Sequence, residues 1–289
     1  VISVEFNMQV VTSVDELRQA ISLQKQQGRT VGFVPTMGNL HQGHLELVKV
    51  AAHQADYIVA SIFVNPLQFG AGEDYEKYPR THEQDKAKLS AEDCDLLFLP
   101  GVETMYPLPI EQQTRVEVPG LSDILCGASR PGHFVGVSTV VCKLFNLVQP
   151  DKAVFGEKDF QQLMVIRRMV DELCMPVELI GVPVVREKDG LAMSSRNGYL
   201  DKQQRELAPV LHQQMQKLRQ QIQNKANNFT ELEDQAADKL DELGFKTDYI
   251  AIRRSADLGV PEDTEQELVI LAAAYLGSTR LIDNLVVNQ

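Results

Sequence analysis

The stretch "VGFVPTMGNLHQGHLELVK", residues 31–49, decides the fold of the first half of the chain. It begins with an apolar, partly β-branched run, passes through a Pro-Thr-Met-Gly turn and ends in an amphipathic pattern. A strand, a glycine turn and a helix in this order are typical of an open α/β sheet. Two histidines, His41 and His44, lie beside Gly43 at the start of the expected helix.

The same alternation of short strands and amphipathic helices continues as far as residue 184, which predicts a parallel sheet covered by helices. Strands are expected at Thr30–Val34, Tyr57–Val64, Asp95–Leu99, Lys152–Phe155 and Val177–Val184. Helices are expected at Gly43–His53, Thr81–Ser90 and Phe160–Cys174. The fold class is therefore α/β, with a Rossmann-like N-terminal domain over residues 1–184.

From residue 185 the pattern changes to consecutive helices followed by consecutive strands, which predicts a smaller α+β domain over residues 185–289. Its helices are expected at Asp201–Asn224 and Thr230–Leu243, and its strands at Tyr249–Arg253, Leu268–Tyr275 and Leu281–Val286. We expect this domain to act as a lid that carries the "MSSR" segment.

Composition excludes several classes of protein. A net charge of −12 and a pI near 5.0 oppose a broad surface for nucleic acid, which needs clustered Lys and Arg. The four cysteines contain no CxxC pair, which favours reduced thiols. The sequence has neither a membrane span nor a signal sequence, so we expect a soluble, cytoplasmic protein. Met8 is a candidate for the first residue of the natural protein.

The glycine turn favours phosphate binding, although it matches neither common nucleotide motif. Gly38 and Gly43 have Walker A spacing but are followed by His44 instead of Lys, and no GxGxxG occurs. Backbone N–H groups at a helix N-terminus bind phosphate, and a histidine there can donate to charge that builds on a phosphate chain. Zinc binding by His41 and His44 lacks a third ligand, and simple helix capping leaves the glycines unexplained.

Five blocks together resemble the pantoate–β-alanine ligase family of the HxGH nucleotidyltransferases. They are "PTMGNLHQGH" (35–44), "SIFVNPLQFG" (61–70), "YEKYPRT" (75–81), "RPGHFVGVSTVVCKLFNLVQPDKAVFGEKDFQQL" (130–163) and "VREKDGLAMSSRNGYL" (185–200). The blocks cover most of residues 30–200 in order. Asn39 and Phe160 depart from the family pattern, which more often has Ala and Tyr there.

The resemblance implies an ATP site. The residues expected to bind ATP are Met37, Gly38, Asn39, Leu40, His41, Gln42, Gly43, His44, Gly156, Glu157, Lys158, Asp159, Val185, Met193, Ser194, Ser195 and Arg196. Among these, the resemblance gives catalytic roles to His41, His44, Lys158, Ser194, Ser195 and Arg196. No residue is expected to hold a metal directly, and Mg²⁺ is expected with ATP. Taken alone, "GEKD" could be a charged helix cap and "MSSR" an ordinary polar loop.

The resemblance also implies the other substrates. Gln68 and Gln162 are expected to hold pantoate, with Gln68 near β-alanine, and Asn65, Tyr78 and Arg130 to shape the pocket, although Arg130 could instead be structural. The implied reaction makes a pantoyl adenylate and then pantothenate, AMP and pyrophosphate, in a homodimer. Two alternatives remain at this point: another HxGH nucleotidyltransferase that transfers AMP without forming an amide, and a synthetase-like RNA-binding module.

Overall fold

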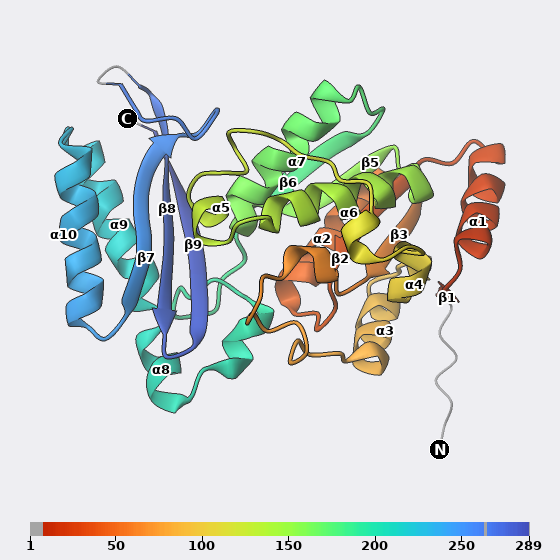
Figure 1. Ribbon diagram of the computed structural model, residues 1–289, viewed down its shortest axis with the longest axis horizontal. Coiled ribbons are helices and arrows are strands. Elements are labelled where there is room, and N and C mark those ends of the chain that lie inside the picture. The colour runs from red at the N-terminus through yellow and green to blue at the C-terminus, as the bar shows by residue number, and fades with distance from the viewer. Residues whose placement is uncertain (1–7, 263–264, 289) are drawn as a thin grey trace. The chain divides into compact units, whose positions relative to one another are not determined.

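A computed structural model of the chain describes residues 8–262 and 265–288 (Figure 1). Residues 1–7 lie outside the described residues, so the expectation that the natural protein starts at Met8 is not tested. Contacts divide the chain into two compact units. The first unit holds residues 1–122, 130–157 and 162–183, and the second holds residues 123–129, 158–161 and 184–289.

The first unit contains a six-stranded parallel sheet in the order β1-β4-β3-β2-β5-β6. The strands are β1 (Gln9–Val11), β2 (Val31–Thr36), β3 (Tyr57–Ile62), β4 (Leu96–Phe98), β5 (Lys152–Gly156) and β6 (Glu178–Val182). The predicted α/β class is confirmed. All six residues of β3 are buried, as expected for a strand with helices on both faces.

Right-handed crossovers place α2 and α3 on one face of this sheet, and α1, α6 and α7 on the other. The helices are α1 (Val14–Gln26), α2 (Gln42–Gln54), α3 (His82–Ala91), α4 (Val102–Met105), α6 (His133–Val148) and α7 (Phe160–Glu172). Leu47, Val48 and Ala51 of α2 pack with Leu89 of α3 in one core cluster. Among the described residues, no helix is both apolar and long enough to cross a bilayer.

The second unit is a three-stranded antiparallel sheet in the order β7-β8-β9 with two long helices packed on it (Figure 1). Its elements are α5 (Cys126–Ser129), α8 (Lys202–Leu207), α9 (Val210–Gln223), α10 (Phe229–Glu242), β7 (Lys246–Arg254), β8 (Glu267–Leu276) and β9 (Thr279–Asn288). Leu211, Met215 and Leu218 of α9 pack with Ile270 of β8 in its core.

The single helix expected over Asp201–Asn224 is a wrong prediction, because the structure has two helices there. α8 ends at Leu207 and α9 begins at Val210, with Ala208 and Pro209 between them. Proline has no backbone N–H and its ring clashes with the preceding turn, so it is tolerated at a helix start but not in the interior.

Candidate active site

The order of the first sheet identifies where a ligand can bind. β2 and β5 are neighbours, yet the chain leaves β2 toward β3 and leaves β5 toward β6. This divergence is a topological switch point, and ligands of open α/β sheets bind beside the carboxyl ends of the strands there. The histidine-containing turn follows β2, and Glu157 follows β5, so both predicted blocks begin at the switch point.

The turn after β2 requires an unusual backbone. Gly38 has φ +83° and Asn39 has φ 48°, both in the left-handed region. A Cβ on Gly38 would stand 2.9 Å from Ile62 Cγ2, so only glycine fits. Asn39 is one of the few other residue types that tolerate this conformation, which explains how the departure from the family pattern is accommodated.

A buried carboxylate holds this turn in place. Asp85 of α3 is fully buried, and it accepts hydrogen bonds from the backbone N–H of Asn39 at 2.9 Å and of Leu40 at 2.8 Å. Thr81 Oγ1 donates to the same carboxylate at 3.0 Å. Asp85 is not among the residues predicted from the sequence, because a carboxylate within a highly charged helix carries no signal of burial.

His41 and His44 form the N-terminal cap of α2. His41 Nδ1 accepts from Gly43 N–H at 3.1 Å, and His44 Nδ1 accepts from His41 N–H at 3.3 Å. The two ring centroids are 4.0 Å apart. Because each Nδ1 accepts a hydrogen bond, the ring proton of the neutral imidazole is on Nε2, which makes Nε2 the donor in both rings.

Leu40 and Gln42 differ in solvent exposure from the other residues of the same sequence block. Leu40 is buried in the core, so only its backbone can meet a ligand. Gln42 is exposed, whereas Met37, Gly43 and both histidines are half-buried.

A second group in the first unit contains the predicted amides. Asn65 is buried, and its Nδ2 donates to Gln68 Oε1 at 3.2 Å and to the Gly136 carbonyl at 3.0 Å. Tyr106 donates its hydroxyl proton to Asn65 Oδ1 at 2.7 Å. The sequence analysis missed Tyr106, which lies 41 residues away along the chain and outside the family blocks.

The short helix η1 (Pro66–Gln68) that presents these amides is packed directly on α6. A Cβ at Gly136 would stand 2.3 Å from the Leu67 carbonyl oxygen and 2.6 Å from the Gln68 nitrogen. Glycine at this position therefore permits the close approach of the two backbones.

Arg130 is tied to the same region. Its guanidinium donates to both Glu73 carboxylate oxygens, at 2.7 and 2.5 Å, and to the Gln68 carbonyl at 3.3 Å. Partial burial alone would raise the pKa of Glu73, but the hydrogen bond and charge of Arg130 lower it. Arg130 Nη1 and His133 Nε2 are 3.1 Å apart, and His133 Nδ1 lies 2.8 Å from the Gln68 carbonyl oxygen.

The two other predicted residues of the first unit differ in burial. Tyr78 is buried and packs edge-on against Phe69, which follows η1. Gln162 is half-buried in the first turn of α7. Tyr78 therefore lies beside the amide group through Phe69, and Gln162 lies near the carboxyl end of β5.

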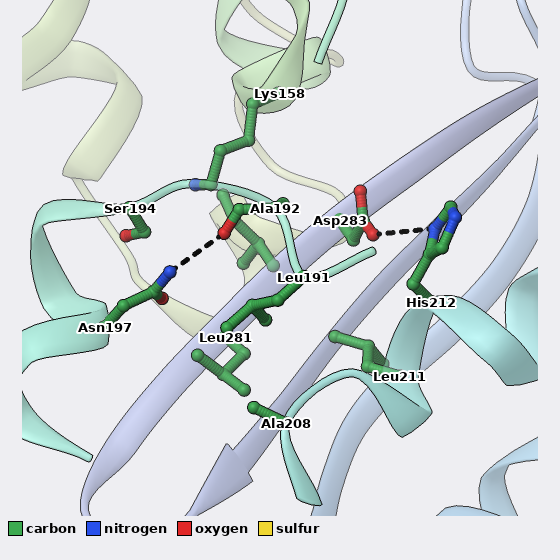
Figure 2. A pocket seen from close by; sticks show the side chains of 11 residues that line it. Lys158, Leu191, Ala192, Ser194, Asn197, Ala208, Leu211, His212, Leu281 and Asp283 are labelled. Atoms are coloured by element: carbon green, nitrogen blue, oxygen red, sulfur yellow. Dashed lines mark hydrogen bonds and ion pairs between the residues drawn. The ribbon is translucent and has the colours of Figure 1, made fainter. Parts of the chain in front are cut away.

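Apart from Gly156 and Glu157, which belong to the first unit, the other predicted residues lie in the second unit. Lys158 and Ser194 line a pocket of that unit, which Figure 2 shows from close by. The pocket is lined by Lys158, Leu191, Ala192, Ser194, Asn197, Ala208, Leu211, His212, Leu281, Ile282 and Asp283. Lys158 is largely buried, at 19% side-chain exposure, and its Nζ is 3.9 Å from the carboxylate of the more exposed Asp159.

The "MSSR" segment leaves a small hairpin and enters a 3₁₀ turn. Met193 N–H donates to the Val185 carbonyl at 3.0 Å, and Arg186 pairs with Ala192 across the hairpin. Ser194 caps the turn by accepting from Arg196 N–H at 3.3 Å. The structure thus brings Val185, Met193 and Ser194–Arg196 together.

Arg186, His212 and Asp283 form an ionic cluster under this hairpin, which the sequence analysis missed. Arg186 donates to the Asp283 carboxylate at 2.6 and 2.9 Å, and His212 Nδ1 is 3.3 Å from the same group. Burial would raise the pKa of Asp283, but the hydrogen bonds from His212 and Arg186 and the charge of Arg186 lower it. The residues lie up to 97 positions apart, so no local pattern connects them.

Comparisons with known proteins identify the family of the chain. The family model described as pantoate-beta-alanine ligase matches residues 9–286. A pantothenate synthetase of Pseudomonas fluorescens strain Pf-5 is 56% identical over 278 residues, which cover 96% of this chain and 97% of the relative.

Solved structures are similar as well. The crystal structure of pantothenate synthetase from Thermus thermophilus has 48% identity and a TM-score of 0.89, covering 96% of this chain and 99% of that one. A pantoate-beta-alanine ligase of Francisella tularensis, complexed with beta-gamma ATP and beta-alanine, has 33% identity and a TM-score of 0.80, with coverage of 96% and 97%. This chain therefore belongs to the pantoate–β-alanine ligase family.

Proposed function

We propose that the two groups of side chains described above carry out an ATP-dependent condensation of pantoate with β-alanine. Because the chain belongs to the pantoate–β-alanine ligase family over residues 9–286, it is an AMP-forming acid–amino-acid ligase that makes pantothenate. ATP supplies the AMP group, and pyrophosphate and AMP are released.

In the first step, a pantoate carboxylate oxygen attacks the α-phosphorus of ATP, and the bond from that phosphorus to the bridging oxygen of pyrophosphate breaks. His41 and His44 donate through Nε2 to the phosphate oxygens that gain negative charge. The hydrogen bonds that occupy both Nδ1 atoms carry this assignment, since they fix the donor tautomer.

The second unit supplies cations and hydroxyls for the same polyanion. Lys158 and Arg196 offset the phosphate charge, and Ser194 and Ser195 donate hydrogen bonds to phosphate oxygens. Gly156, Glu157, Asp159, Val185 and Met193 complete the nucleotide contacts. Mg²⁺ bound together with ATP would neutralise part of the phosphate charge.

In the second step, the amine of β-alanine attacks the acyl carbon of the pantoyl adenylate. The C–N bond forms, the bond from the acyl carbon to the phosphate oxygen breaks, and the amine loses its proton as AMP leaves. Gln68 and Gln162 hold pantoate, while Asn65, Tyr78 and Arg130 shape its pocket. Gln68 is suited to this role because Asn65, Arg130 and His133 all fix its position.

Isotope exchange between ATP and labelled pyrophosphate tests the first step. We expect exchange only when pantoate is present. Exchange without pantoate, or none with it, would contradict the assignment. Adding β-alanine then separates the ligase from a nucleotidyltransferase that stops at AMP transfer, because only the ligase releases an amide product.

We further infer that the enzyme is a cytoplasmic homodimer that associates through its first unit. All four cysteines are free, with Cys94 buried and Cys174 exposed, which suits a reducing compartment. Val102 and Leu108 of the first unit expose apolar side chains. Sedimentation equilibrium should give twice the chain mass of 32.3 kDa, and a single-chain mass would contradict the dimer.

A further inference from the structure

Two adjacent residues of β9, Asp283 and Asn284, contact both of the segments of the second unit that are proposed to bind the phosphates, namely the hairpin before Ser194 and the segment that holds Lys158. Neither residue lies in the blocks that identified the family, which end at residue 200. Both side chains are buried, at 4% exposure for each residue. Figure 2 shows Asp283 pointing from β9 toward the His212 ring, close to Leu191.

Asp283 anchors the segment that leads into Ser194. Its two carboxylate oxygens accept from the two terminal nitrogens of Arg186, which is the first residue of the bridged hairpin. Arg186 also donates to the Gly190 carbonyl at 3.1 Å, across the same hairpin. A bidentate Arg–carboxylate pair fixes orientation as well as distance, so Asp283 sets where the hairpin sits on the sheet.

The tip of the hairpin is fixed from a second side. Gly190 has φ +94°, and a Cβ there would stand 3.1 Å from His212 Cδ2. His212 in turn is 3.3 Å from Asp283. The hairpin is therefore packed on the same ionic cluster that holds its base.

Asn284 anchors the segment that contains Lys158. Asn284 Nδ2 donates to the Lys158 carbonyl oxygen at 2.9 Å. Asn284 N–H donates to Asp283 Oδ1 at 2.8 Å, and Arg186 Nη2 donates to the Asn284 carbonyl at 3.3 Å. The backbone of Lys158 and the base of the hairpin are thus hydrogen-bonded to neighbouring residues of one strand.

We infer that Asp283 and Asn284 are positioning residues that hold Lys158 and the Ser194–Arg196 turn in the arrangement needed to stabilise the departing pyrophosphate. This inference rests on the proposed roles of Lys158 and Ser194–Arg196. Neither β9 residue needs to touch the substrate. They act by placing the hydrogen-bond donors of Lys158 and the Ser194–Arg196 turn. A small displacement of such donors can greatly lower the rate of the chemical step.

The two half-reactions separate positioning from general stability. Only the first step involves the β- and γ-phosphates, whereas the adenylate consumed in the second step carries a single phosphate. In Asp283→Asn and Asn284→Ala, we expect pantoate-dependent pyrophosphate exchange to fall on the order of 100-fold. Pantothenate formation from supplied pantoyl adenylate and β-alanine should stay near the wild-type rate.

Glu233→Gln is the matched control in the same unit. Glu233 also accepts from an arginine, Arg253, at 2.9 Å, and from a backbone N–H, that of Ile252, at 2.6 Å, and its side chain is 17% exposed. Both half-reactions should remain near wild type in this variant. Thermal unfolding of each variant shows whether it folds. If the buried substitution Asp283→Asn prevents folding, the exchange rate of Asn284→Ala tests the inference instead.

Equal loss of both half-reactions in a folded variant, or loss of neither, would overturn the positioning role. Absence of pantoate-dependent exchange in the wild-type enzyme would instead refute the proposed function itself. The two failures are therefore distinguishable in one set of assays.

Discussion

The two ring nitrogens of His41 and of His44, at the start of α2, have different roles. Nδ1 of His41 and of His44 satisfies a backbone N–H that has no partner within the helix. This makes Nε2 the donor, so the cap that starts the helix also selects the tautomer that the proposed catalytic role needs. In the proposed mechanism, these two residues have both a structural and a chemical role.

His44→Ala should therefore remove a phosphate donor at a small cost in stability. Loss of a stabilising donor lowers the rate on the order of 100-fold or more, and loss of a cap costs about 1 kcal/mol. Pyrophosphate exchange and thermal unfolding measure the two effects. His53→Ala is the control, because His53 is an exposed residue in the last turn of the same helix. Near-normal exchange in His44→Ala would refute the donor role.

The contact of α6 with η1 positions the amides of the proposed pantoate pocket. Gly136→Ala forces its Cβ against the Leu67 carbonyl. We expect a loss of about 1–3 kcal/mol in the free energy of unfolding, as for other overpacked sites, and a higher KM for pantoate. Denaturant unfolding and steady-state kinetics measure these effects.

Gly101→Ala provides the comparison for Gly136→Ala. A Cβ at Gly101 meets nothing within 4 Å, and its φ of −77° suits any residue. This variant should match wild type in both measurements. A Gly136→Ala enzyme with unchanged stability and KM would show that α6 and η1 separate without cost.

The Glu73–Arg130 pair ties the loop after η1 to the segment before α6, and its contribution should depend on pH. The folded-state pKa of Glu73 is lowered, so the ionised form stabilises the fold. That stability is complete above the ordinary glutamate pKa of about 4.3 and is lost as the pH falls through the lower folded value. The difference in unfolding free energy between wild type and Glu73→Gln should shrink on acidification, and a constant difference would contradict this.

Periodicity in the sequence predicted many of the elements, but α1 was not predicted although its buried residues Leu17, Ala20 and Ile21 have helical spacing. The strand and helix around His41 were expected at Thr30–Val34 and Gly43–His53, close to their observed bounds. α6 was not predicted, because it is buried on most sides and its apolar, β-branched sequence shows no polar face. The roles of Asp85 and Asp283 could not be foreseen, since the turn residue Leu40 lies 45 positions from Asp85, and Arg186 lies 97 positions from Asp283.

For the whole molecule, the net charge of −12 conflicts with substrates that are themselves anions. In the proposed mechanism, Lys158 and Arg196 offset the charge of a small ligand, but two such cations cannot offset the charge of a long polyanion. We therefore expect no electrophoretic shift of tRNA by the enzyme at low or moderate salt. A salt-sensitive shift would revive the RNA-binding interpretation.

The path of the chain through the two units limits how the enzyme can be divided. The chain passes from one unit to the other at residues 122/123, 129/130, 157/158, 161/162 and 183/184. Gln161 and Cys126 are hydrogen-bonded to each other at 3.1 Å, and Arg280 of β9 donates to the Cys126 sulfur at 3.4 Å. A fragment that begins at Val184 would therefore lack Cys126 and Gln161, which belong to the second unit. During synthesis on the ribosome, the second unit cannot be completed until β9 has emerged.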